Sequence, residues 1–99
     1  MSEVLVLEFE GFGRNVYDAV NRELGMNDDW SAGEIPAGLI DHVAGASAVG
    51  WVVLEVWESR EAQAAFMENR LGAALHAGGV TGPPSRMEWL SDPSHHLVG

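Results

Sequence analysis

Residues 49–57 (VGWVVLEVW) constrain the fold of this chain more than any other segment. Large apolar and β-branched side chains dominate the segment, which is typical of a β-strand. Side chains of a strand alternate between its two faces. One face then carries Val52, Leu54 and Val56, and the other carries Trp51, Val53, Glu55 and Trp57. Because both faces are largely apolar, we expect both to be buried in the folded protein.

Strands and helices alternate along the rest of the chain. Apolar runs bounded by turn residues predict further strands at residues 3–9, 38–46 and 85–90. Helical spacing of apolar residues predicts one helix over 14–24, ended by Gly25, and a second from the N-cap Ser59 to Gly78, with a kink at Gly72. The short connection at 45–48 favours an antiparallel hairpin. The order βαββαβ predicts an α+β, ferredoxin-like domain over residues 1–90, a four-stranded antiparallel sheet with two helices on one face, and a tail over 91–99.

The charge and composition exclude several classes of protein. Fifteen Asp and Glu residues against five Lys and Arg residues give a net charge of −10, which repels nucleic acids and anionic membranes. The absence of cysteine excludes disulfides, thiolate nucleophiles and cysteine metal sites. No apolar run approaches the roughly 20 residues of a membrane span, and residues 1–9 contain Glu3 and Glu8 where a signal peptide is basic. We therefore expect a cytoplasmic protein. The lack of lysine is a separate observation and is typical of a high-GC bacterial genome.

The predicted sheet has one face that no helix covers. By strand alternation we expect this face to carry Val4, Val6, Trp51, Val53 and Trp57. Such a patch is too apolar to stay exposed on a stable monomer. We therefore expect a homodimer in which two sheets face each other across a two-fold axis. The alternative is that the loop at 26–36 and the C-terminal tail cover part of the patch.

The segment Val53-Leu54-Glu55-Val56-Trp57-Glu58-Ser59, followed by Glu61-Ala62 and Phe66, resembles the third strand and second helix of the dimeric α/β-barrel superfamily. This superfamily includes the antibiotic-biosynthesis monooxygenase-like domains. Length, element order and the expected dimer extend the resemblance over nearly the whole chain. It implies a fold more strongly than an activity, because members include cofactor-free quinone-forming monooxygenases, haem-degrading enzymes, decarboxylase-like and isomerase-like enzymes, and proteins with no known activity.

The resemblance to the haem-degrading members is incomplete. Trp57, Phe66 and His76 match the places of a strand-end tryptophan, a helical aromatic and a haem-ligating histidine. That branch has Trp where this chain has Phe66, and a first-strand Asn where this chain has Glu8 and Phe9. We therefore expect no cofactor, with haem as the less favoured alternative.

His42 and Glu55 are the candidate catalytic residues. His42 lies in a predicted strand, and an imidazole can act as a general base near neutral pH. The Glu55 carboxylate lies among large apolar neighbours and needs a partner there, for which we expect Arg86. Glu8 is expected to share this environment. The alternative is structural: a histidine bonded to a carbonyl or carboxylate, and a buried ion pair at Glu55.

The candidate substrate-binding residues are aromatic, with one arginine. They are Trp51, Trp57, Phe66, Arg86 and Trp89. For the tryptophans, the core or the dimer interface is the alternative place. Trp30 lies in the polar loop at 26–36, and we expect its indole to pack against the fold. His95 and His96 lie in the tail and are assigned no metal.

These residues predict a small-molecule-binding protein of the dimeric α/β-barrel kind. As an enzyme it would be a cofactor-independent monooxygenase acting on an aromatic or polyketide-type substrate. The competing hypothesis is a binding or assembly module without catalysis.

Overall fold

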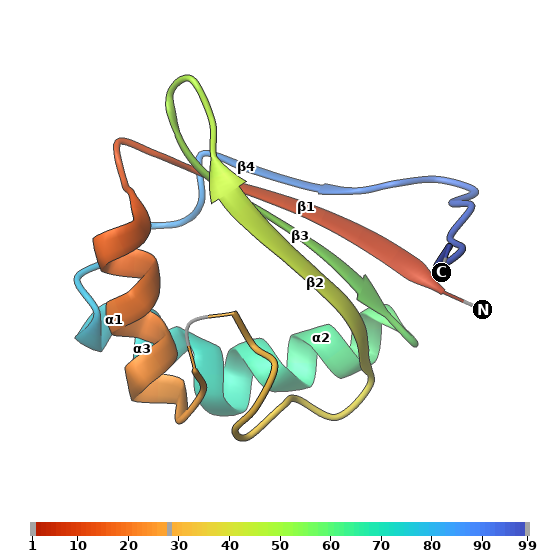
Figure 1. Ribbon diagram of the computed structural model, residues 1–99, viewed down its shortest axis with the longest axis horizontal. Helices are drawn as coiled ribbons and strands as arrows, with labels where there is room; N and C mark the ends of the chain where they lie inside the picture. Colours follow the sequence, from red (N-terminus) through yellow and green to blue (C-terminus); the bar gives the residue numbers. More distant parts are fainter. Residues whose placement is uncertain (1, 28, 99) are drawn as a thin grey trace.

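The computed structural model describes residues 2–27 and 29–98 of the chain. In chain order the elements are β1 (Glu3–Glu10), α1 (Arg14–Leu24), β2 (Leu39–Ala46), β3 (Gly50–Trp57), α2 (Arg60–Phe66), the π-helical turn η1 (Met67–Leu71), α3 (Gly72–Ala77) and β4 (Arg86–Trp89). The strands form one antiparallel sheet in the order β2-β3-β1-β4, and the helices pack on one of its faces (Figure 1). The predicted α+β, ferredoxin-like fold is therefore confirmed.

The predicted helix boundaries have local causes. Gly25 ends α1 in the left-handed conformation, with φ of 79°, which glycine adopts without steric cost. Ser59 begins α2, because its Oγ accepts a hydrogen bond of 3.1 Å from the Ala62 N–H. The irregularity expected at Gly72 takes the form of η1, a wider turn that ends there. A Cβ at position 72 would lie 3.1 Å from the Met67 carbonyl oxygen.

The register of β1 on β3 decides which side chains face the helices. Leu5 lies opposite Glu55, and Leu7 lies opposite Val53. Paired residues share a face of the sheet, and Trp57 packs in a cluster with residues of α1 and α2. The prediction that Trp51, Val53 and Trp57 lie on the uncovered face is therefore wrong. Both faces of β3 are apolar, so alternation alone does not reveal which one the helices cover.

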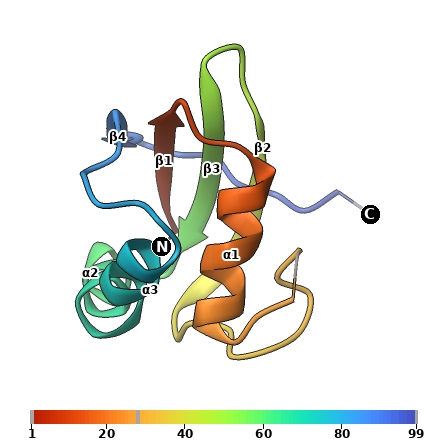
Figure 2. The same cartoon turned by 90° about the vertical axis from the view of Figure 1, so that its left-hand side faces the viewer.

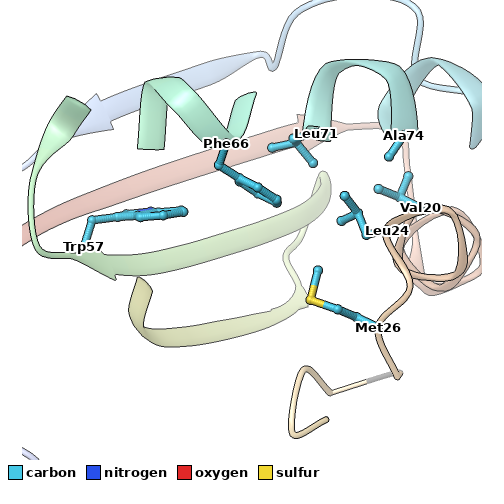
Figure 3. Close-up of a cluster of buried hydrophobic side chains, with 7 residues drawn as sticks. All are labelled: Val20, Leu24, Met26, Trp57, Phe66, Leu71 and Ala74. Carbon is cyan, nitrogen blue, oxygen red and sulfur yellow. The ribbon is translucent and has the colours of Figure 1, made fainter. Parts of the chain in front are cut away.

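The core lies between the sheet and the helices in two clusters. Figure 3 shows the cluster formed by Val20, Leu24, Met26, Trp57, Phe66, Leu71 and Ala74. The second cluster consists of Leu5, Leu7, Trp51 and Val53, with Tyr17 of α1 packed against it. Trp89 touches both clusters. The large aromatic residues of β3 thus fill the layer that separates the sheet from the helices.

The opposite face of the sheet, which we call the open face, is partly covered by the C-terminal tail. The tail crosses behind the sheet in Figure 2, and His95 Nε2 lies 3.3 Å from Asp41 Oδ2 on this side. Val4 and Val56, which pair with each other on the open face, are buried. Val43 on β2 remains 58% exposed. The alternative of partial cover by the tail therefore holds at the end of the sheet that contains Val4 and Val56.

Candidate functional site

A cavity of about 60 Å³ lies between the sheet and the helices. Its walls are mostly apolar and come from β1, β3, α1 and α3, including Leu7, Val53, Val16 and Leu75. Its polar lining residues are Tyr17, Asn21, His42 and Glu55, with the indole of Trp30 beside them. An apolar cavity in which a few polar groups converge is the usual form of a small-molecule site.

The two candidate catalytic residues meet at this cavity. His42 on β2 lies opposite Glu55 on β3, and His42 Nδ1 is 3.3 Å from Glu55 Oε2. Their side chains are 6% and 3% exposed. Because a carboxylate accepts hydrogen bonds, we assign the Nδ1 proton as the one donated to Glu55, which leaves Nε2 of the neutral ring as an acceptor. This orientation presents the basic nitrogen of His42 to α1.

Tyr17 of α1 meets that basic nitrogen. Its hydroxyl oxygen lies 2.6 Å from His42 Nε2, and in the assigned tautomer the hydroxyl donates this bond. Glu55 receives a second donor, since Trp57 Nε1 donates to Glu55 Oε1 at 3.0 Å. Both oxygens of the buried carboxylate thus have a partner. The result is a hydrogen-bonded chain, Tyr17–His42–Glu55, of the kind that holds a histidine ready to accept a proton.

The phenol of Tyr17 is held in its protonated form. Burial raises the pKa of Tyr17 above its usual value of 10.0, and the Glu55 charge raises it further, against a hydrogen bond with Asn21 that lowers it. Asn21 lies one helical turn along α1 and is 1% exposed. Tyr17 is therefore a proton donor to His42 at neutral pH and is not itself ionised.

The pKa shift predicts an alkaline loss of stability. Tyr17 is the one tyrosine, and the chain has no cysteine and no lysine, so no other side chain titrates between about pH 9 and 12. A folded-state pKa above the unfolded value stabilises the protein fully below pH 10 and loses that contribution as the pH rises through the folded pKa. The phenolate absorbance should titrate above 10.0 in the native protein and at a lower pH in urea. Tyr17→Phe should remove this pH dependence from the free energy of unfolding measured in urea. An equal phenol titration in the folded and unfolded states would contradict the raised pKa of Tyr17.

The other expected site residues are dispersed. Trp51 lines the cavity, and Arg14 lies over its ring at 5.2 Å. Trp57 is fully buried beneath Glu55. Phe66 borders a second, surface groove with Arg70 instead of the cavity. Trp89 lies on the edge strand β4, outside the cavity lining.

Two expectations about the surroundings of Glu55 are wrong, namely its pairing with Arg86 and the nearness of Glu8. Arg86 pairs with Glu88, two residues along β4, and both are exposed. Glu8 accepts a hydrogen bond of 2.9 Å from Ser47 Oγ and alternates with Leu7, which faces the helices, so it lies on the open face. The partners of Glu55 are instead His42 and Trp57, because β2 is paired directly with β3, whereas β1 separates β3 from β4.

The residues present do not fit a haem group. His76, at the place of the haem-ligating histidine, is exposed on α3 and is absent from the cavity lining. Within residues 2–27 and 29–98, no group of three or more His, Asp or Glu side chains is placed to hold a metal ion. In the same residues, no helix is both long and apolar enough to cross a membrane.

The sequence does not identify three residues as part of the site: Tyr17, Asn21 and Trp30. Tyr17 and Asn21 are four residues apart on α1, which is a detectable signal for one helix face. Trp30 was expected to pack against the fold, and it does so by stacking on His42, with ring centroids 3.7 Å apart and planes 7° apart. Nothing in the loop sequence indicates that His42 is its partner.

Comparison with known proteins supports the fold. The sequence matches no protein-family model and no curated protein. The structure is similar to a crystal structure from Chloroflexus aurantiacus J-10-fl that is provisionally described as an antibiotic biosynthesis monooxygenase. The match covers 100% of both chains, with a TM-score of 0.66 and 17% sequence identity. The resemblance to the antibiotic-biosynthesis monooxygenase-like domains is thus confirmed at the level of the fold.

Proposed function

We propose that the protein binds a weakly acidic aromatic molecule in the cavity and removes its proton, as a cofactor-independent monooxygenase-like enzyme. The observation that carries the proposal is the buried chain Tyr17–His42–Glu55 at the polar end of an otherwise apolar cavity. Apolar walls can pack against an aromatic ring, and a histidine oriented by a carboxylate can accept the proton of a phenol. The fold match to the Chloroflexus protein is in keeping with this class of activity.

The chain supplies a route for the proton. A phenol bound with its hydroxyl at Tyr17 loses its proton to the Tyr17 oxygen, while the Tyr17 proton moves to Nε2 of His42. The Glu55 carboxylate, 3.3 Å from Nδ1, then stabilises the imidazolium. The phenol is left as an electron-rich phenolate among apolar walls.

Dioxygen is the co-reactant and the oxidant in this proposal. It adds to a ring carbon of the phenolate, forming a carbon–oxygen bond. One oxygen atom remains as the second carbonyl of a quinone, and the other leaves as water with the two hydrogens lost from the phenol O–H and the ring C–H. The apolar walls keep bulk water away from the ring carbon of the phenolate, which carries carbanion character, during this step.

Paired variants test the enzyme hypothesis. His42→Gln and Glu55→Gln should each lower oxygen consumption on a reactive hydroxylated polycyclic aromatic by about 10²–10⁴-fold. Both variants are nearly isosteric and keep hydrogen-bonding groups in place. Each is assayed for turnover, for ligand binding and for melting temperature.

Matched controls come from the same elements of the fold. Glu8→Gln changes a carboxylate of the same sheet that bonds to Ser47 on the open face, and His76→Gln changes an exposed histidine. Both should leave turnover unchanged. If no aromatic ligand binds the wild type at millimolar concentration and the site variants only destabilise, the enzyme hypothesis fails and the binding or assembly module replaces it.

We also propose that the open face mediates a homodimer. Its apolar residues Val6, Val52 and Leu54 are only partly buried, and Val43 is more than half exposed. Two such faces packed across a two-fold axis would remove this surface from water. Sedimentation at micromolar concentration should give a dimer mass for the wild type and a monomer mass for Val43→Asp. A monomeric wild type would contradict the assembly.

A further inference from the structure

The cavity is too small for the ligand class that its chemistry suits. Its volume is about 60 Å³, whereas a cavity that binds benzene has about 150 Å³. A single aromatic ring therefore does not fit while all the lining side chains stay in place. Space for a ring must come from one of these side chains, and Trp30 is an aromatic lining residue carried by a loop.

Trp30 makes the contacts that a bound aromatic molecule would make. Its indole lies parallel to the His42 ring, 3.7 Å from it, and meets the ring of Phe66 edge-on at 82°. Its Nε1–H donates a hydrogen bond of 2.7 Å to Oδ1 of the buried Asn21. Parallel stacking, an edge contact and one polar anchor define a slot for a flat molecule with a donor on its rim.

Trp30 lies in an irregular loop and not in a helix or a strand. Trp30 has a φ of 64°, a left-handed conformation that is strained for a bulky residue. Asn27 and Ser31 bond to each other beside it, at 2.7 Å, on the exposed surface. Buried Met26 anchors the start of the loop, and Arg70 binds the Glu34 carbonyl oxygen near its end. An outward movement of the Trp30 indole would leave these anchors in place.

We propose that Trp30 is an internal stand-in for the ligand: the slot between His42 and Phe66 binds a planar, fused-ring aromatic molecule with an N–H or O–H donor, which enters by displacing the indole. The inference rests on the proposed function in that both use the same cavity. It adds that the ligand is planar, that it bonds to Asn21, and that the Trp30 indole competes with it for the slot. A hydroxyl anchored at Asn21 lies next to Tyr17, which also bonds to Asn21.

Free indole tests the slot directly. Trp30→Ala should bind indole at millimolar concentration or tighter and gain melting temperature from it, whereas the wild type should bind at least tenfold more weakly. 1-Methylindole, which lacks the N–H donor, should bind Trp30→Ala less tightly than indole. Trp89→Ala is the control, because Trp89 is half-buried against both core clusters and lies outside the cavity. It should not prefer indole over 1-methylindole.

A measurement on the wild type covers the case in which Trp30→Ala does not fold. With 5-fluorotryptophan at all four tryptophans, 2-naphthol should shift the ¹⁹F resonance of Trp30, assigned with Trp30→Phe, more than those of Trp57 and Trp89. Equal affinity of wild type and Trp30→Ala for 2-naphthol, or an unmoved Trp30 resonance in the complex, overturns the inference. If Trp30→Ala binds indole selectively but His42→Gln and Glu55→Gln leave turnover intact, the slot stands and the proposed function fails.

Discussion

Gly50→Ala is expected to destabilise the protein by about 3 kcal/mol or more. A Cβ at position 50 would lie 2.2 Å from the Phe9 carbonyl oxygen and 2.9 Å from the Glu10 Cα. These atoms belong to the backbone of β1, the strand paired with β3 at the centre of the sheet. No side-chain rotation relieves such a contact, so the two strands must separate. Urea unfolding of the purified variant measures the loss.

Gly45→Ala is the matched control for this prediction. Gly45 lies on the neighbouring strand β2, and a Cβ there would have no atom within 4 Å. Its substitution should therefore change the free energy of unfolding by less than about 0.5 kcal/mol. Equal losses for the two variants would contradict the close approach of β3 to β1 at Gly50.

Trp57→Ala is expected to cost about 3–5 kcal/mol of stability. The indole is 0% exposed and packs in the main core cluster, and its N–H donates to Glu55. Truncation leaves both a cavity and a buried carboxylate oxygen without this donor. Such a loss is a large part of the roughly 5–15 kcal/mol that stabilises a domain.

Trp57→Phe separates the two contributions. The phenyl ring keeps most of the apolar volume but cannot donate to Glu55, so we expect about 1–3 kcal/mol from the lost hydrogen bond, plus a smaller loss from packing. Unfolding in urea gives both values. An unchanged melting temperature for Trp57→Ala would show that the indole does not pack in the core.

The sequence predicts the elements of this fold well because their signals are local. The Gly25 cap, the Ser59 cap and the alternation in β3 depend on neighbouring residues. The choice of the covered face is not local. It depends on how the volumes of Trp51 and Trp57 fit beneath helices that come from elsewhere in the chain, and for this reason the face was predicted incorrectly.

The contacts of the candidate site also include some that follow from local sequence and some that do not. A tight hairpin between β2 and β3 places His42 opposite Glu55, so their meeting follows from the turn position. The meeting of Tyr17 with His42 depends on how α1 is rotated above the sheet, and that of Trp30 with His42 depends on the path of an irregular loop. Neither has a periodic signal. The expected pairing of Arg86 with Glu55 is wrong because β4 joins the sheet next to β1, two strands away from β3, which carries Glu55.

The hydrogen-bonded groups around the cavity begin and end in tryptophan. Trp57 donates to Glu55 at one end, and Trp30 donates to Asn21 at the other. An indole N–H donates but cannot accept, so neither end can pass a proton onward. Within the described residues, a network that ends in these two indoles can store a single proton on His42 and passes none onward through either tryptophan. A proton taken from a ligand would stay on His42 until the product, or water admitted to the cavity, takes it back.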